Sequence, residues 1–163
     1  MKKTNAMRIL DGLKISYDVH EYDDDGEHKL ERGAANLTAQ KLGEDPSCVF
    51  KTIVMRTESK ETVVFCQSAI HEINLKKARN ACGAKEITPV KQDELLGLTG
   101  YIRGGCSPLG MKRKFRTFID LSALEHKKIF ISAGVRGMQI ELSPEDLVKA
   151  TNAVTADLIL EQN

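Results

Sequence analysis

A loop rich in glycine and proline is the first feature of the sequence that could do chemistry. Three glycines and a proline fall within GGCSPLG at 104–110. Glycine lets a backbone approach a ligand closely and proline restricts the chain, so the amides of such a loop can be aimed at a developing oxyanion. Because most clusters of this kind are ordinary connections, the loop alone does not define a site.

Two further segments could act together with this loop. Lys51 lies near the start of the apolar stretch VFKTIV, which is typical of a buried strand. A lysine in that setting more commonly extends its ammonium group to solvent than serves a site. The segment ISAGVRG at 131–137 interrupts a strand pattern with small residues. That break indicates either a plain hairpin turn or a binding edge.

The cysteines and histidines favour neither a protein nucleophile nor a metal site. Cys106 lies inside the loop, but the sequence places no base beside it, so an inert thiol is the preferred interpretation. The 4 cysteines form no CxxC pair. The histidines stand far apart without metal-ligand spacing, at His20, His28, His71 and His126. We therefore predict no metal and no cofactor.

A run of cations, MKRKFR at 111–116, follows the loop directly. Such a run either contacts nucleic-acid phosphates or forms a solvated charged edge. The whole chain does not decide between the two, because 24 Lys and Arg against 23 Asp and Glu leave a formal net charge of +1. Any basic surface for nucleic acid must therefore be local.

The length of the chain and its 41% hydrophobic residues predict a single domain over residues 1–163, since they are enough to build one core. The helices and strands that must position these segments indicate a mixed fold. Periodicity and capping residues predict helices at 5–12, 34–42, 74–82, 92–98 and from Ser143 onward. Strands are expected at 15–19, 49–56, 62–68, 101–102, 117–121, 128–132 and 138–142. The predicted class is α+β, with a mixed, largely antiparallel, barrel-like sheet flanked by helices.

The N-terminal segment gives no sign of export. MKKTNAMRILDGLKI contains two lysines but no long apolar run, and the acidic stretch that follows could not enter a membrane. We therefore expect a cytoplasmic protein without a membrane partner.

The order of VFKTIV, TGYIRGGCSPLG and ISAGVRG resembles the YbaK family, which is similar to the editing domain inserted in bacterial prolyl-tRNA synthetases. The resemblance runs from about Leu10 to Leu158, and its most specific part is GxxxP from Gly104 to Pro108 between FKT and SAGxRG. It implies a mixed sheet surrounded by helices. It also implies a deacylase that acts in trans on mischarged tRNA, most typically cysteinyl-tRNA(Pro). tRNA would be its partner, and a prolyl-tRNA synthetase a further one.

The same resemblance implies a site. Lys51 would lie in the pocket and engage the terminal ribose or phosphate, while the GxxxP loop would approach the aminoacyl carbonyl. Other residues implied by the matched motifs are Tyr22, Thr52, Gly105, Ser107, Ser132, Gly134 and Gln139. With an acceptor stem expected near the loop, Lys112, Arg113 and Lys114 of the basic run become candidates for tRNA binding, and a solvated edge is the equal alternative. A strand-end tyrosine is usually packing, however, and a serine beside glycine is usually turn chemistry. Gln139 is a departure, because the family often has an aspartate there, so a mechanism that needs this carboxylate is in doubt.

The resemblance leaves the chemistry and the substrate partly open. In the family, the thiol of a cysteinyl substrate is thought to attack its own carbonyl and leave as a thiolactone, which would explain why no Ser-His-Asp or Cys-His arrangement is visible. Alanyl or another small aminoacyl group is the main alternative substrate. A non-catalytic module that binds tRNA or a synthetase is the alternative class, although it would be expected to lose some of Lys51, Tyr22 and the loop.

Overall fold

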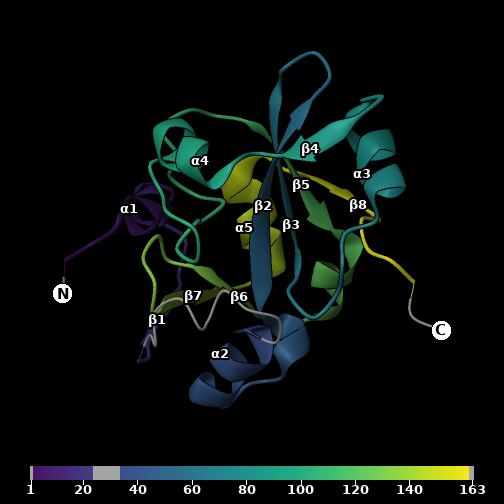
Figure 1. Cartoon of the computed structure of the whole chain (residues 1–163). Helices are drawn as coiled ribbons and strands as arrows, with labels where there is room; N and C mark the ends of the chain where they lie inside the picture. The colour runs from purple at the N-terminus through teal and green to yellow at the C-terminus, as the bar shows by residue number, and fades with distance from the viewer. Residues whose placement is uncertain (1, 24–33, 162–163) are drawn as a thin grey trace.

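The computed structural model describes residues 2–23 and 34–161, in which the strands form two sheets (Figure 1). The larger sheet has the order β4 (Ile87–Pro89), β2 (Phe50–Thr57), β3 (Thr62–Ser68), β5 (Arg116–Asp120) and β8 (Val154–Ala156). The smaller sheet has the order β1 (Asp18–Glu21), β7 (Met138–Leu142) and β6 (Ile129–Ser132).

Five α-helices accompany the sheets in the described residues, and most begin and end where capping residues predict. They are α1 (Asn5–Gly12), α2 (Ala34–Leu42), α3 (Leu75–Cys82), α4 (Gln92–Thr99) and α5 (Pro144–Thr151), with short 3₁₀ turns at Pro46–Cys48 and Leu121–Glu125. Thr4, Asn74 and Ser143 each accept a hydrogen bond from a first-turn amide. Gly83 and Gly100 end α3 and α4 in left-handed conformation, with φ of 74° and 85°.

The strand pairing confirms a mixed, largely antiparallel arrangement. The strands β2 and β3 form an antiparallel hairpin, and β2–β4, β1–β7 and β6–β7 are also antiparallel, while β3–β5 and β5–β8 are parallel. A barrel-like closure is not confirmed, because the two sheets stay separate. An isolated parallel bridge between Val49 and Phe130 joins them where β2 begins.

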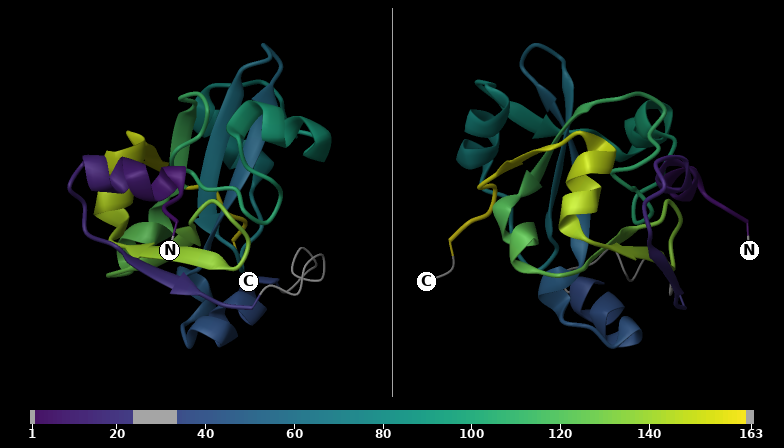
Figure 2. Two further views of the ribbon diagram at one scale, coloured as in Figure 1. Left: turned by 90° about the vertical axis from the view of Figure 1, so that its left-hand side faces the viewer. Right: turned by 180° about the vertical axis from the view of Figure 1, so that it is seen from behind.

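Each face of the larger sheet has its own core. β3 is buried along its whole length, and its side chains point alternately into the two cores. Val63 and Phe65 pack under α3, whereas Cys66 faces a core shared with α1, α5 and the smaller sheet. Seen from behind, α5 lies across the larger sheet between α1 and β8 (Figure 2).

The structure departs from the sequence-based prediction at a few elements. The strand expected at 101–102 is wrong, since Tyr101 and Ile102 lie in an irregular segment. The short edge strands β4 and β8 were not predicted, and β1 begins only at Asp18. None of the helices in residues 2–23 and 34–161 is long and apolar enough to cross a membrane.

Candidate functional site

The smaller sheet brings four of the predicted site residues together. Ser132 on β6 lies opposite Gln139 on β7, and the Gln139 side-chain amide donates to the Tyr22 hydroxyl across 3.4 Å. The Tyr22 backbone amide donates to Gly137 O at 2.9 Å, so the chain that follows β1 stays beside the 134–137 turn. Ser132 Oγ accepts from the Gly134 amide at 3.1 Å, which is the turn chemistry expected of a serine beside glycine.

Lys51 lies on the larger sheet, half-buried and directly opposite Gln67 in the β2–β3 register. The two side chains share one face of the sheet. Burial lowers the pKa of Lys51 from its ordinary 10.5, and the nearby carboxylate of Glu72 partly opposes that shift. Gln67 is fully buried, and its amide donates to His71 O at 2.8 Å, which holds the connection that carries Glu72. Lys51 is thus partly desolvated, with a carboxylate nearby.

We expect the Glu72→Gln substitution to lower the pKa of Lys51 further. Removing the carboxylate leaves the desolvation unopposed, so the neutral amine is favoured. An NMR titration of the Lys51 side chain measures the pKa, with Glu145→Gln on the exposed first turn of α5 as the matched control. A Lys51 pKa that stays the same or rises in Glu72→Gln would contradict the electrostatic coupling.

The bridge between the sheets places Lys51 near the residues of the smaller sheet. Val49 pairs in parallel with Phe130, and Lys51 and Ser132 each lie two residues further along their strands. Both strands run in the same direction from the bridge, so Lys51 and Ser132 each follow it by two residues. Predicted site residues of both sheets therefore lie just beyond this bridge, which we call the junction of the two sheets.

The GxxxP loop packs against the 134–137 turn through Gly105. A Cβ atom on Gly105 would lie 3.2 Å from backbone atoms of Val135 and Arg136, so the two segments touch closely. The Gly105 amide already donates to Ile102 O at 3.0 Å. The Ser107 side chain is fully buried, and its hydroxyl accepts from the Leu109 amide at 3.3 Å. Within the loop, Ser107 thus serves the loop conformation.

Tyr101 is the residue of this region that sequence reasoning missed. Its hydroxyl donates to Leu109 O at 2.5 Å, and its ring lies where a Cβ on Gly134 would approach Tyr101 Cε1 to 2.8 Å. Burial raises the pKa of Tyr101 to about 12. The side chain therefore connects the loop to the 134–137 turn. Its only sequence signal was its place just before GGCSPLG, in a segment predicted to be a strand.

Cys106 and Thr52 lie on the other side of the larger sheet from Lys51. Thr52 pairs with Cys66 in the β2–β3 register and hydrogen-bonds to it, while Cys106 lies near enough to Cys66 to affect its pKa. Burial raises the pKa of Cys106 to about 11, although a hydrogen bond with Thr99 opposes the shift. At neutral pH Cys106 is therefore a thiol and a weak nucleophile.

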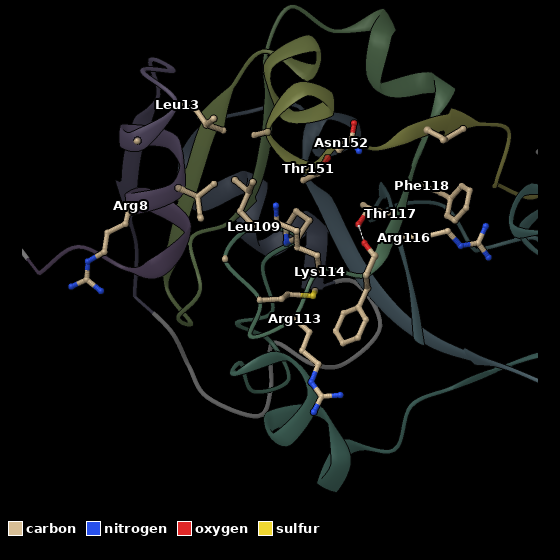
Figure 3. A pocket seen from close by; sticks show the side chains of 18 of the residues that line it. Arg8, Leu13, Leu109, Arg113, Lys114, Arg116, Thr117, Phe118, Thr151 and Asn152 are labelled. Carbon is tan, nitrogen blue, oxygen red and sulfur yellow. Dashed lines mark hydrogen bonds between the residues drawn. The ribbon is translucent and has the colours of Figure 1, made fainter. Parts of the chain in front are cut away.

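The predicted tRNA-binding cations do not share one environment, although all three are exposed. Lys112 lies over Gly100 at the end of α4, where a Cβ on Gly100 would be 3.3 Å from Lys112 Cγ. Arg113 and Lys114 instead line a pocket of about 940 Å³ (Figure 3). Pro108 also lines this pocket, whereas Lys51 and the Tyr22–Gln139 pair do not. The pocket is thus distinct from the junction of the two sheets.

The histidines in residues 2–23 and 34–161 have separate neighbours: His20 packs on Phe130 beside the bridge, His126 packs on Phe50, and His71 O accepts from Gln67. His20 Nε2 lies 2.9 Å from Glu141 Oε1, while His28 lies outside the described residues. Among residues 2–23 and 34–161, no three His, Cys, Asp or Glu side chains are grouped so that they could hold a metal ion.

Comparison with known proteins identifies the family to which this chain belongs. Residues 32–150 match the model of the aminoacyl-tRNA editing domain, and the chain belongs to that family. This confirms the resemblance read from VFKTIV, the GxxxP loop and ISAGVRG.

Individual relatives agree with this family. The chain is 37% identical over 161 residues to EbsC of Enterococcus faecalis, whose name proposes Cys-tRNA(Pro)/Cys-tRNA(Cys) deacylase activity; the match covers 99% of this chain and 96% of EbsC. It is 35% identical over 72 residues to proline–tRNA ligase of Brachyspira hyodysenteriae, covering 44% of this chain and 12% of the ligase. A crystal structure described as a trans-editing enzyme for prolyl-tRNA synthetase superposes with a TM-score of 0.82 at 22% identity, over 99% of this chain and all of that one. That structural likeness supports the fold.

Proposed function

We propose that the protein deacylates mischarged tRNA in trans, with cysteinyl-tRNA(Pro) as the preferred substrate. The observation that supports the proposal is the bridge between the two sheets, which lies two residues before both Lys51 and Ser132. The Tyr22–Gln139 pair and the 134–137 turn, against which Gly105 packs, belong to the smaller-sheet side of this bridge. The family membership supports the reaction class, and the likeness to EbsC supports the substrate. The protein would act in the cytoplasm, with prolyl-tRNA synthetase as a further partner.

The proposed reaction needs positioning more than a strong protein nucleophile. An aminoacyl ester is already activated, so hydrolysis is accelerated chiefly by holding the attacking atom and stabilising the oxyanion. Lys51 would bind the terminal ribose or its phosphate. Gly104 leaves the loop backbone exposed at its start, but the Gly105 amide is engaged with Ile102 O. A donor to the oxyanion would therefore come from another amide of the loop, such as that of Gly104.

The substrate thiol would be the attacking group. Its sulfur, as thiolate, bonds to the ester carbonyl carbon, the carbon–oxygen bond to the ribose breaks, and the ribose oxygen takes up a proton. The product is a cysteine thiolactone, which water then opens to free cysteine. The raised pKa of Cys106 agrees with this proposal, because a protonated thiol of the protein does not compete as nucleophile at neutral pH.

Gln139 would recognise the amino group of the substrate in place of the carboxylate common in the family. Its Oε1 atom is buried and has no hydrogen-bond partner in the described part of the chain, while its amide nitrogen donates to Tyr22. A buried acceptor without a partner is costly, so a ligand that donates to it gains affinity. An ammonium group on the aminoacyl moiety is such a donor.

The test is hydrolysis of purified cysteinyl-tRNA(Pro) and alanyl-tRNA(Pro) by the purified protein in EDTA. We expect release of cysteine at an undiminished rate in EDTA, and slower release of alanine, since alanine has no thiol to attack the ester. Activity that is lost in EDTA and restored by zinc would contradict the metal-free mechanism. Binding of tRNA without release of either amino acid would show a non-catalytic module instead.

A further inference from the structure

The pocket beside the GxxxP loop is lined by cations and apolar side chains. Of the residues that line it, Arg8, Arg113, Lys114 and Arg116 are cationic and none is acidic. Arg116 is already engaged, because its guanidinium donates to both carboxylate oxygens of Glu61 at 2.7 and 2.9 Å. Arg8 donates to the Asn5 side-chain oxygen at 3.1 Å, and the described part of the chain gives none of Arg8, Arg113 and Lys114 a carboxylate partner. The charge of these three residues therefore favours an anion.

The pocket also offers a surface for a flat apolar group. Phe115 is half-exposed between Lys114 and Arg116, and apolar side chains of α1, including Ile9 and Leu13, line the pocket nearby. A volume of about 940 Å³ lies at the upper end of the range for small-molecule sites, about 300–1,000 Å³. Phosphate alone would leave this apolar surface unused. A nucleotide, with a charged phosphate and a base that can stack on an aromatic ring, uses both.

We propose that this pocket binds a nucleotide of the RNA strand that carries the aminoacyl group, close to its terminal adenosine. The proposal rests on the function proposed above, because mischarged tRNA is the RNA that such a deacylase meets. Pro108, in the pocket wall, is three residues beyond Gly105, or at most about 11 Å along the chain. A strand whose end lies at the loop therefore reaches the pocket within a few nucleotides.

The charges of the pocket fix the orientation of the nucleotide. Arg113 lies on one side of the pocket and the carbonyl end of α5, with Thr151 and Asn152, on the other, while Lys114 lies between them (Figure 3). The negative end of the helix dipole disfavours a phosphate near Asn152. The phosphate therefore lies toward Arg113, and the base stacks on Phe115, which lies two residues further along the chain.

Binding of RNA that carries no aminoacyl group tests this site without any ester chemistry. The probe is a labelled hairpin with the acceptor-stem sequence and single-stranded 3′ end of tRNA(Pro), titrated over a range of salt concentrations. We expect Arg8→Glu and Arg113→Glu each to weaken binding and to reduce the salt slope by about 0.7 for every phosphate that the protein no longer neutralises. Phe115→Ala should weaken binding by about fivefold to a hundredfold, because the base loses its stacking partner, with the slope unchanged.

Lys127→Glu, an exposed charge reversal outside the pocket, is the matched control and should bind as wild type does. The inference is overturned if the pocket variants behave like this control, if a hairpin without the 3′ single strand binds equally well, or if polyglutamate binds as tightly. Should Phe115→Ala fail to fold, the two arginine variants still decide.

Hydrolysis of aminoacyl-tRNA by the same protein preparation is measured separately, so that the two proposals can be told apart. Binding through the pocket without deacylation would overturn the proposed function alone, and deacylation without a pocket effect would overturn this inference alone.

Discussion

Replacing Lys51 by alanine is expected to slow deacylation about a hundredfold while the fold is retained. Lys51 is half-buried, and its ammonium would hold the substrate ester against the loop amides. Without it the ester is misplaced, and a displacement of about 1 Å is enough for a loss of this size. Single-turnover deacylation measures the rate, and far-UV circular dichroism checks the fold. If folded Lys51→Ala kept full activity, the assignment of the site would be wrong.

Cys106→Ala is the matched control for the loss of deacylation rate in Lys51→Ala. Because burial raises the pKa of Cys106 to about 11, we expect this variant to keep most of the wild-type rate. Lys51→Met serves as a second comparison, since it keeps the aliphatic stem but removes the charge, and it should lose activity as Lys51→Ala does. A folded Cys106→Ala without activity, or an acyl group trapped on Cys106, would show that the protein supplies the nucleophile.

The second large effect is expected for Gly134→Ala. Gly134 has φ of +109°, outside the conformations of other residues, and its Cβ would lie 2.8 Å from Tyr101 Cε1. The Tyr101 ring cannot move away cheaply, because its hydroxyl is bonded to Leu109 O. Backbone strain and overpacking of about 1–3 kcal/mol each should destabilise the protein. The midpoint of thermal unfolding should then fall by roughly 4–24 °C, with a loss of activity as the turn moves away from Gly105.

Gly83→Ala is the control that separates the effect of a close side-chain contact from the effect of a positive φ alone. Gly83 also has a positive φ, +74°, but a Cβ there would meet nothing within 4 Å. We expect it to cost about 1 kcal/mol and to leave deacylation unchanged. Equal losses of stability and activity in Gly83→Ala and Gly134→Ala would mean that contact with Tyr101 does not hold the turn in place.

Local signals predicted most of the elements. Thr4, Asn74 and Ser143 cap helices because their side chains reach amides three residues away, an interaction contained in the sequence itself. The short edge strands had no such signal. Pro89 argues against a strand, and it is tolerated in β4 because that strand lies at the edge of its sheet.

The site was predictable in its members but not in its geometry. Motifs indicated Lys51 and Ser132 separately, but their approach depends on the bridge between Val49 and Phe130, residues distant in the sequence. Tyr101 and Ile102 have strand-forming side chains, so pattern reasoning assigned a strand. The contacts of Tyr101 with Gly134 and Leu109 are instead tertiary. The sequence likewise gives no sign of the pocket, since its wall combines Arg8 of α1 with Arg113, which are far apart in the chain.

The measurement that tests the proposed mechanism most directly compares cysteinyl- and seryl-tRNA(Pro) in one single-turnover assay. Serine is nearly isosteric with cysteine, but its hydroxyl is a far weaker nucleophile, so the pair varies the attacking atom while changing little else. If the protein positions the substrate and the substrate thiol attacks, cysteinyl-tRNA(Pro) is deacylated rapidly and seryl-tRNA(Pro) only slowly. Equal rates for the two substrates, or faster release of serine, would contradict this mechanism.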